Sequence, residues 1–272
     1  METVTRPQHL ESAAADDPVA AAKSFDAALE SIRRFHSSVF WGDRMLTLDK
    51  SASFRDDPKF RAAVASANSD TGANQYSSPD GIAWRFNTLI WAAKQALLVE
   101  GEFIECGVYE GDMSWVVTEM VDLPAHRRCM YLYDTFAGFS PKYSSPADYP
   151  DAPQFFDIAQ SGYSRASLHA GVVERFADKP YVRVIKGVVP DVLHETAPSK
   201  IAFLHLDMNS PGPESRALDL LYDRISTGGV IIFDDYGWKM FSKQKEAADS
   251  IMAARGQLVL ELPTGQGMAI KR

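Results

Sequence analysis

The chain has 272 residues, enough for one large α/β domain with additional elements. Its hydrophobic content of 46% is ordinary for a globular protein, and a formal charge of −8 without a Lys/Arg-rich run argues against a nucleic-acid partner. The sequence shows neither an apolar stretch of membrane-spanning length nor a secretion signal. Cys106 and Cys129 stand in apolar, strand-like contexts that suit a reducing compartment, so we expect a cytoplasmic protein.

The first 79 residues predict structure outside the main domain. Residues 1–22 are polar and rich in Ala and Asp, which predicts a disordered tail. Residues 23–79 mix helical patches with aromatic residues, and we expect a helical cap or lid, with a loop over 68–78. Ser78-Pro79-Asp80 then resembles a helix start, and Gly101 is placed to close that helix.

From residue 80 to residue 272, strand and helix patterns alternate, as in a parallel sheet. Helices are predicted after the first strand, from Pro213 to about Ile225, and over 243–254. Strands are predicted at 102–106, 129–133, 182–186, 201–206 and 229–233, followed by 258–262 and 268–270. The last two strands are joined by a short turn and must be antiparallel. We expect an α/β fold with a mostly parallel seven-stranded sheet ending in an antiparallel hairpin. This is the outline of a Rossmann-like class I methyltransferase, although such edge strands occur in other mixed sheets too.

Acidic residues follow two of the predicted strands. Asp207 ends the strand at 201–206, and the doublet Asp234-Asp235 ends the strand at 229–233. Parallel strands end at one edge of a sheet, which is where ligands bind in open α/β folds. Carboxylates gathered there repel one another unless a cation joins them, so the pattern favours a hard metal ion such as Mg²⁺. Ordinary solvated strand ends are the alternative.

A glycine-containing turn, Glu105 to Gly111, leaves the first strand of the domain. Asp134 ends the next strand and can accept hydrogen bonds from a ribose, although a dinucleotide dehydrogenase would carry an acid there too. Glu105, Glu110 and Asp112 crowd the helix N-terminus, where they would oppose a pyrophosphate. The cationic cofactor S-adenosylmethionine suits an acidic turn better.

The connection at 137–164 is long and rich in aromatic residues, which predicts a lid or binding loop rather than a disordered insertion. Its aromatic residues include Tyr143, Tyr149, Phe155, Phe156 and Tyr163.

Taken together, these motifs resemble the class I O-methyltransferases of the macrocin and aminocoumarin type, which methylate sugar hydroxyls in natural-product pathways. The likeness runs from about Asp80 to the C-terminus. It rests on Gly101–Val108, Tyr133–Phe139, Val184–Gly187, Leu204–Asp207, Gly228–Gly237 and Pro263–Gly267, in this order.

The resemblance implies which residues bind the cofactor and the metal. Coordination to Mg²⁺ would lower the pKa of an acceptor hydroxyl and orient it for methyl transfer. The metal ligands implied are Asp207, Asp234 and Asp235. The cofactor residues implied are Glu105, Gly107 and Gly111 for the methionine part, Asp134 and Phe136 for the ribose, and Gly187 and Val188 for the adenine.

The chain also departs from that family. Such enzymes usually carry a second aspartate, a suggested general base, where this chain has Asn209 in Asp207-Met208-Asn209. An amide cannot take a proton at neutral pH. His205 is the nearest conventional base, since strand alternation puts it on the same face as Asp207, although a core histidine is the alternative. Asp112 stands where the family commonly has glycine, so the chain resembles a variant branch.

We expect an S-adenosylmethionine- and Mg²⁺-dependent O-methyltransferase, with Asp207 and His205 as catalytic candidates and a hydroxyl of a sugar or other small metabolite as acceptor. A catalytically degenerate protein that binds cofactor or metabolite on the same fold is the main alternative. A metal-dependent hydroxylase or hydrolase ranks last because the expected histidine ligands are missing. Neither nucleic acid nor membrane is expected as a partner, and monomer and homo-oligomer both stay open.

Overall fold

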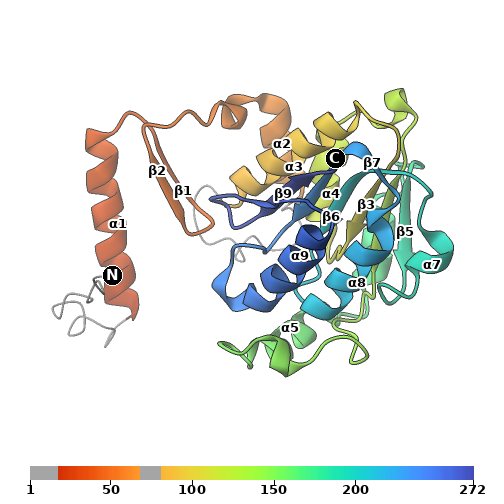
Figure 1. Ribbon diagram of the computed structural model, residues 1–272. Coiled ribbons are helices and arrows are strands. Elements are labelled where there is room, and N and C mark those ends of the chain that lie inside the picture. The colour runs from red at the N-terminus through yellow and green to blue at the C-terminus, as the bar shows by residue number, and fades with distance from the viewer. Residues whose placement is uncertain (1–17, 68–80) are drawn as a thin grey trace.

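The computed structural model describes residues 18–67 and 81–272 (Figure 1). Most of the predicted tail, the predicted loop at 68–78 and the predicted helix start at Ser78 lie outside these residues. Helix α1 covers Pro18–Phe35, so it begins inside the segment that the sequence assigned to a tail.

A seven-stranded sheet forms the centre of the molecule, in the order β5-β4-β3-β6-β7-β9-β8. Its neighbours are parallel except where β9 pairs with β7 and β8. The predicted fold class is confirmed, with the C-terminal hairpin at the sheet edge. The strands are β3 (Glu102–Cys106), β4 (Met130–Asp134), β5 (Val182–Lys186), β6 (Ile201–Leu206), β7 (Ile225–Phe233), β8 (Leu260–Glu261) and β9 (Gly267–Ile270).

Helices cover both faces of this sheet (Figure 1). Alternate residues of one strand serve opposite faces: Phe203 packs with the first group of helices, and Leu204 packs with the second. Because both faces are covered, β6 is apolar along most of its length. The first group is α2 (Pro58–Ala67), α3 (Ala83–Ala96), α4 (Asp112–Met120) and α6 (Leu168–Arg175), and the second is α7 (Leu193–Thr196), α8 (Pro211–Tyr222) and α9 (Ser242–Ala254).

Several boundaries differ from the sequence prediction, most clearly at the ends of two helices. The helix placed from Pro213 begins at Pro211 and ends at Tyr222, and Ile225, which its apolar spacing included, is the first residue of β7. Helix α3 ends at Ala96, followed by a turn, so Gly101 does not close it directly. Periodicity alone could not place these ends because apolar residues continue across the connection.

The carboxyl ends of β3, β4, β6 and β7 meet at one edge of the sheet. Backbone hydrogen bonds extend the strand pairing past the strands themselves, from Asp207 N to Cys106 O (2.8 Å) and from Asp234 N to Leu206 O (2.9 Å). Strand β3 lies between β4 and β6, so the chain order reverses beside it, which is where open α/β sheets bind ligands.

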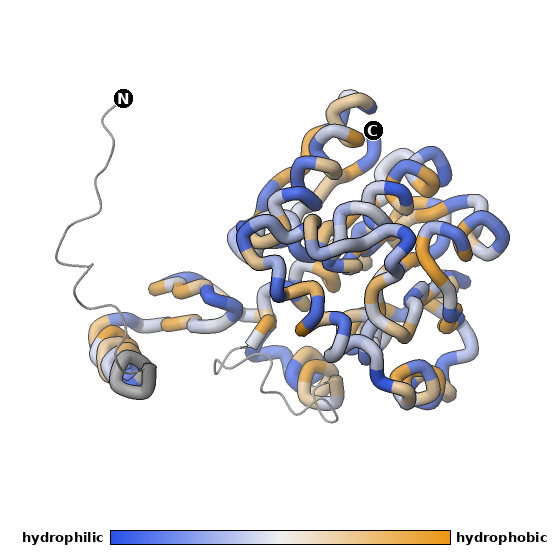
Figure 2. The backbone as a smooth tube through the Cα atoms, turned by 90° about the horizontal axis from the view of Figure 1, so that it is seen from below, coloured by the Kyte–Doolittle hydropathy of each residue, from blue (hydrophilic) through white to orange (hydrophobic). Residues whose placement is uncertain are grey.

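The N-terminal region contains a hairpin where a helical cap was expected. Strands β1 (Val39–Gly42) and β2 (Met45–Leu48) pair antiparallel, followed by a short 3-10 helix at Ser53–Asp56. The tip residues Asp43 and Arg44 have φ of 51° and 57°, as a two-residue hairpin turn requires. Figures 1 and 2 show α1 standing away from the body, on the far side of this hairpin. The helical prediction is therefore wrong for residues 39–48.

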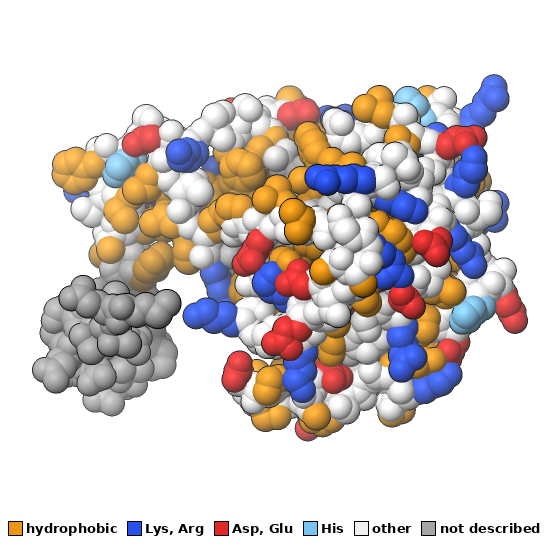
Figure 3. Space-filling model, in the orientation of Figure 1, with side chains coloured by type: hydrophobic (Ala, Val, Ile, Leu, Met, Phe, Trp, Pro, Cys, Tyr) orange, Lys and Arg blue, Asp and Glu red, His pale blue; other side chains and the backbone are white. Residues whose placement is uncertain are grey.

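The aromatic segment at 137–164 is ordered around a short helix, α5 (Phe155–Tyr163). The ring of Phe139 stacks on Phe156 with centroids 5.2 Å apart, and Tyr149 lies edge-on to Phe155 at 5.0 Å. Further short 3-10 helices lie at Pro124–His126, Pro146–Asp148 and Lys239–Phe241. None of the described helices is both long and apolar enough to cross a membrane. On the face shown in Figure 3, acidic and basic side chains are interspersed among the described residues.

Candidate active site

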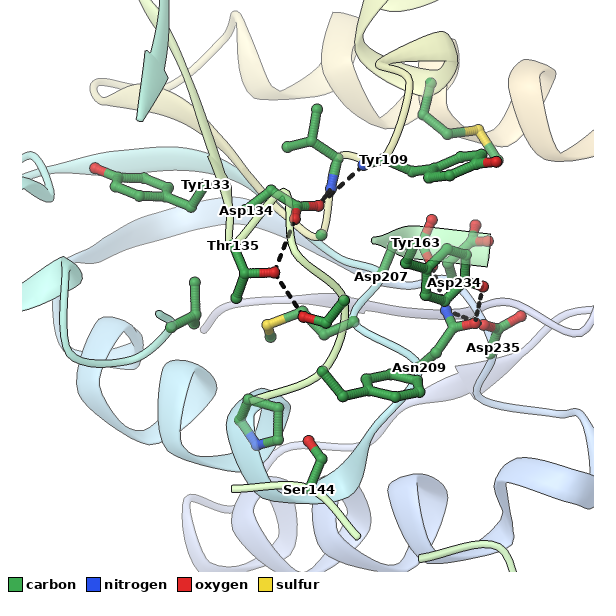
Figure 4. A pocket seen from close by; sticks show the side chains of 18 of the residues that line it. Tyr109, Tyr133, Asp134, Thr135, Ser144, Tyr163, Asp207, Asn209, Asp234 and Asp235 are labelled. Carbon is green, nitrogen blue, oxygen red and sulfur yellow. Dashed lines mark hydrogen bonds between the residues drawn. The ribbon is translucent and has the colours of Figure 1, made fainter. Parts of the chain in front are cut away.

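A cavity of about 290 Å³ opens at the carboxyl edge of the sheet. It runs from the ends of β3 and β4 to the ends of β6 and β7, and the 137–164 segment and the N-terminal hairpin contribute to its wall. The cavity thus joins the predicted cofactor turn to the predicted metal site. Its polar and aromatic lining includes Asp43, Arg85, Tyr109, Asp134, Thr135, Ser140, Ser144, Tyr163, Asp207, Asn209, Asp234 and Asp235 (Figure 4).

Gly107 allows the turn after β3 to pass directly beside the end of β6. Its φ is +88°, and a Cβ built there would lie 1.8 Å from the carbonyl oxygen of Asp207. Gly111, with φ of +84°, precedes α4 and faces the ring of Phe176. Backbone conformation and close contact therefore both require glycine at position 107.

Asp134 binds the cofactor turn from the neighbouring strand. Its Oδ2 accepts the backbone N–H groups of Val108 at 2.7 Å and Tyr109 at 2.9 Å, and its Oδ1 accepts that of Phe136 at 2.6 Å. This carboxylate lines the cavity and has lone pairs left for a hydroxyl pair. It therefore orders the turn whether or not it also holds a ribose.

The other predicted cofactor residues do not belong to the cavity wall. Glu105 is buried and accepts a hydrogen bond from Ser114. Phe136 is buried with a positive φ beside His169, and Gly187 donates its N–H to the Asp134 carbonyl at 2.9 Å. Val188 and Gly111 are also absent from the lining, in which Val189 stands instead.

The predicted metal ligands converge, as expected, and a side chain of the protein already joins two of them. Arg85 on α3 donates to Asp234 Oδ2 at 2.5 Å and to Asp235 Oδ1 at 3.3 Å. Asn209 Nδ2 lies 2.9 Å from both Asp207 Oδ1 and Asp235 Oδ2, and donates to each (Figure 4). The guanidinium therefore supplies part of the positive charge that the sequence assigned to a metal alone.

The donor set still fits a divalent cation. Burial and the charges of Asp234 and Asp235 raise the pKa of Asp207 well above its usual range. Burial raises the pKa of Asp235 to about 6, although Arg85 opposes this. Asp234 goes the other way: Arg85 and His205 outweigh burial and lower its pKa. A cation nearby would favour the ionised form of these carboxylates. Carboxylate oxygens are also the ligands that Mg²⁺ prefers.

His205 does not fit the role of general base. Its side chain is buried, with Nδ1 at 2.9 Å from Glu105 Oε1 and Nε2 at 3.5 Å from Asp234 Oδ1. Burial opposes the charge, but the neighbouring carboxylates of Asp234 and Glu105 raise its pKa to about 10. The imidazole is therefore protonated at neutral pH and cannot accept a proton. It offers Asp234 and Glu105 a positive charge, and its Nε2 lies within 4.8 Å of ligand atoms of Asp207 and Asp234.

Arginines neutralise the acids that crowd the cofactor turn. Arg165 pairs with Glu110, and Arg175, on α6, pairs with Asp112. The argument that these carboxylates would repel a pyrophosphate is therefore wrong for Glu110 and Asp112, whose charges are balanced. Their partners lie more than 50 residues away in the sequence, so the pattern could not reveal them.

Two tyrosines of the aromatic segment form hydrogen bonds with Asn209. Tyr149 donates its hydroxyl to the Asn209 carbonyl at 2.5 Å, and Tyr163 donates to the side-chain oxygen of Asn209 at 3.1 Å. The predicted lid or binding loop thus forms one wall of the cavity, beside the acids. The Asn209 amide thus donates to two carboxylates and accepts from Tyr163.

Sequence reasoning missed two residues at the acidic end. Arg85 stands on the buried stripe of α3, close to Ile82 and Phe86, and a charge at a core position was a readable signal. Asp43, at the hairpin tip, accepts a hydrogen bond from Arg85 Nε at 2.7 Å. The turn itself is Asp43-Arg44, which is not among the dipeptides that predict a hairpin.

Solved structures with this fold include methyltransferases. The O-methyltransferase NovP matches with a TM-score of 0.58 and 19% identity over 71% of this chain and 81% of that chain. The calicheamicin methyltransferase CalS11 matches with a TM-score of 0.60 and 14% identity over 81% of this chain and 97% of that chain. A putative caffeoyl-CoA O-methyltransferase from Staphylococcus aureus matches at 0.54 and 10% identity over 81% of this chain and 95% of that chain. No curated protein matches the chain by sequence.

The sheet order and the antiparallel C-terminal hairpin are those of the class I methyltransferase fold. The family model for macrocin-O-methyltransferase (TylF) matches residues 85–256. The chain belongs to this family, which confirms the predicted family resemblance and the prediction of an S-adenosylmethionine-dependent methyltransferase.

Replacing Gly107 by alanine tests the close approach of β3 and β6. The added methyl would collide with the Asp207 carbonyl and strain the positive φ, so we expect a loss of about 2 kcal/mol or more in the free energy of unfolding and weaker cofactor binding. Gly171→Ala on α6, where nothing lies within 4 Å, serves as the control and should be neutral or slightly stabilising. Urea denaturation compares the two, and equal stability would contradict the close approach.

Proposed function

We propose that this protein is an S-adenosylmethionine- and Mg²⁺-dependent O-methyltransferase that acts on a hydroxyl of a sugar or other small natural-product metabolite. The observation that carries the proposal is the continuous cavity, which has the Asp134 turn at one end and the acids Asp207, Asp234 and Asp235 at the other. A cofactor and an acceptor bound in it would lie side by side, as direct methyl transfer requires.

The cofactor would lie along the ends of β3 and β4. Gly107 and Val108 leave room for its methionine part, and Asp134 would hold its ribose hydroxyls. Glu105, Gly111, Phe136, Gly187 and Val188 would support this site from behind the wall, by shaping the turns that carry it.

Asp207, Asp234 and Asp235 would hold Mg²⁺, and the side-chain oxygen of Asn209 is available to it if the amide turns. The ion would supply a Lewis acid that acidifies and orients the acceptor hydroxyl. The residues of this chain do the rest: Arg85 keeps Asp234 and Asp235 together, and Tyr163 and Phe139 bound the space over the acceptor.

The relatives support the acceptor class. The name of the family contains macrocin, and CalS11 is named as a calicheamicin methyltransferase. Both names point to natural products. A small-molecule acceptor, as in these relatives, and a cytoplasmic location belong to the proposal.

Asn209 favours a second candidate, a protein that binds cofactor or metabolite without turnover. The family's suggested base is replaced by an amide, which cannot take a proton, and its N–H groups donate to Asp207 and Asp235.

Calorimetric titration and a turnover assay separate the two candidates. We expect S-adenosylmethionine to bind, and methyl transfer to a panel of glycosylated acceptors to require Mg²⁺, stop with a chelator and return when Mg²⁺ is restored. Failure to bind the cofactor would contradict the proposal. Tight binding without turnover on the panel would favour the second candidate.

Asp134→Ala tests the ribose site. A charge-assisted hydrogen-bond pair is worth about 1.5–3 kcal/mol, so the dissociation constant for S-adenosylmethionine should rise roughly tenfold to a hundredfold. Asp151→Ala, which removes an exposed acid, should leave it unchanged. Asp134→Asn is a second variant that keeps one oxygen to accept the N–H groups of the turn. If the dissociation constant for S-adenosylmethionine is unaltered in both variants, the ribose role is ruled out.

A further inference from the structure

The proposed reaction needs a group that takes the acceptor's proton, and the obvious places do not provide one. Asn209 is an amide, and His205 is buried against Glu105 and does not belong to the cavity wall. Asp134 accepts three backbone N–H groups from the turn beside it. These groups are engaged in holding the site together.

Among the described residues, the carboxylates in the cavity wall are Asp43, Asp134, Asp207, Asp234 and Asp235. The last three form the proposed metal site, and Asp134 orders the cofactor turn. Asp43 remains, and it enters the cavity from outside the methyltransferase sheet, at the tip of the β1–β2 hairpin.

The hairpin holds Asp43 in a defined position. Its side chain is only 9% exposed, and Arg85 Nε donates to its Oδ2 at 2.7 Å. Arg85 also pairs with Asp234 and Asp235. Its guanidinium group therefore links Asp43 to the proposed metal ligands. The neighbouring Arg44 lies over the ring of Trp238, 5.0 Å from its centroid, and anchors the tip.

Asp43 keeps an oxygen for another partner. Its Oδ1 receives only a long hydrogen bond, from Arg85 Nη2 at 3.4 Å. A carboxylate oxygen has two lone pairs, so Oδ1 can accept a hydrogen bond from an acceptor hydroxyl in the cavity.

We propose that Asp43 is the general base of this methyltransferase and takes the proton of the acceptor hydroxyl, in place of the aspartate that Asn209 replaces. This inference rests on the proposed function. As the acceptor oxygen bonds to the methyl carbon, the S–CH₃ bond breaks and its electron pair stays on sulfur, giving neutral S-adenosylhomocysteine. The proton moves to Asp43 Oδ1, and the resulting carboxyl group later returns it to water.

The surroundings of Asp43 suit a base. Burial raises its pKa, and Asp234 at the end of β7 adds to this, whereas Arg85 on α3 and Arg44 on the hairpin lower it. A carboxylate with a raised pKa is a stronger base. The active, ionised form is lost as the pH falls through this raised pKa.

Asp43→Asn tests the assignment with little risk to the fold, because asparagine is favoured at the positive φ of such hairpin tips. General bases contribute about 10²–10⁴-fold, so kcat on an acceptor that the wild type methylates should fall at least a hundredfold. The dissociation constant for S-adenosylmethionine should stay the same. The acid limb of the pH profile of kcat should disappear, and Asp43→Glu should recover part of the rate.

Asp56→Asn, which removes an exposed acid of the same region, should behave as the wild type. An unchanged kcat in Asp43→Asn would overturn the proposal, and so would a lower kcat that keeps the wild-type acid limb, since Asp43 would then only position Arg85. If the wild type binds no cofactor or methylates no acceptor, the proposed function fails first and the base falls with it. If both the wild type and the Asp43→Asn variant are fully active, the proposed function stands and only the assignment of Asp43 as the base is wrong.

Discussion

The carboxylates gathered at one edge of the sheet cannot remain together without positive charge, and the site is built around how that charge is supplied. Arg85 and the protonated His205 provide two cations from the protein. They face a larger group of acids: Asp43, Glu105, Asp207, Asp234 and Asp235. Burial and the neighbouring acids raise the pKa values of Asp207 and Asp235, so further positive charge would favour their ionised forms. A divalent ion would supply such a charge.

The fold forces this concentration of charge beside the cofactor turn. Parallel pairing brings the ends of β6 and β7 together, and Asp207 and Asp234 continue the backbone hydrogen bonding of their neighbours. Gly107 lets the turn after β3 touch the Asp207 carbonyl. A methyl donor on that turn and an oxygen near the acids are thereby neighbours, so binding alone supplies most of the alignment that the transfer needs.

The sequence predicted those parts of the structure that local pattern determines. The run from Ile201 to Leu206 is apolar enough to define β6 to the residue, and the acid after it then had to lie at the sheet edge. The charge state of His205 could not be predicted, because its partner Glu105 lies 100 residues away. The same holds for Asp112, which Arg175 neutralises.

The hairpin escaped prediction for a different reason. Its strands have four residues each, which is too short for a period of two to stand out from helical patches. Arg85 was overlooked because the helix pattern was read from its apolar positions only. Asp43 and Arg85 form an ion pair that joins the hairpin to α3. Such a contact exists only in the folded chain.

Titration with Mn²⁺, followed by the electron paramagnetic resonance signal of the free ion, tests the central claim most directly. The account predicts a metal site in the wild type that Asp235→Asn weakens at least tenfold, while Asp223→Asn, the loss of an exposed acid, changes nothing. A wild-type protein that binds no Mn²⁺, or a variant at position 235 that binds it equally well, would contradict the claim that these acids share a divalent ion.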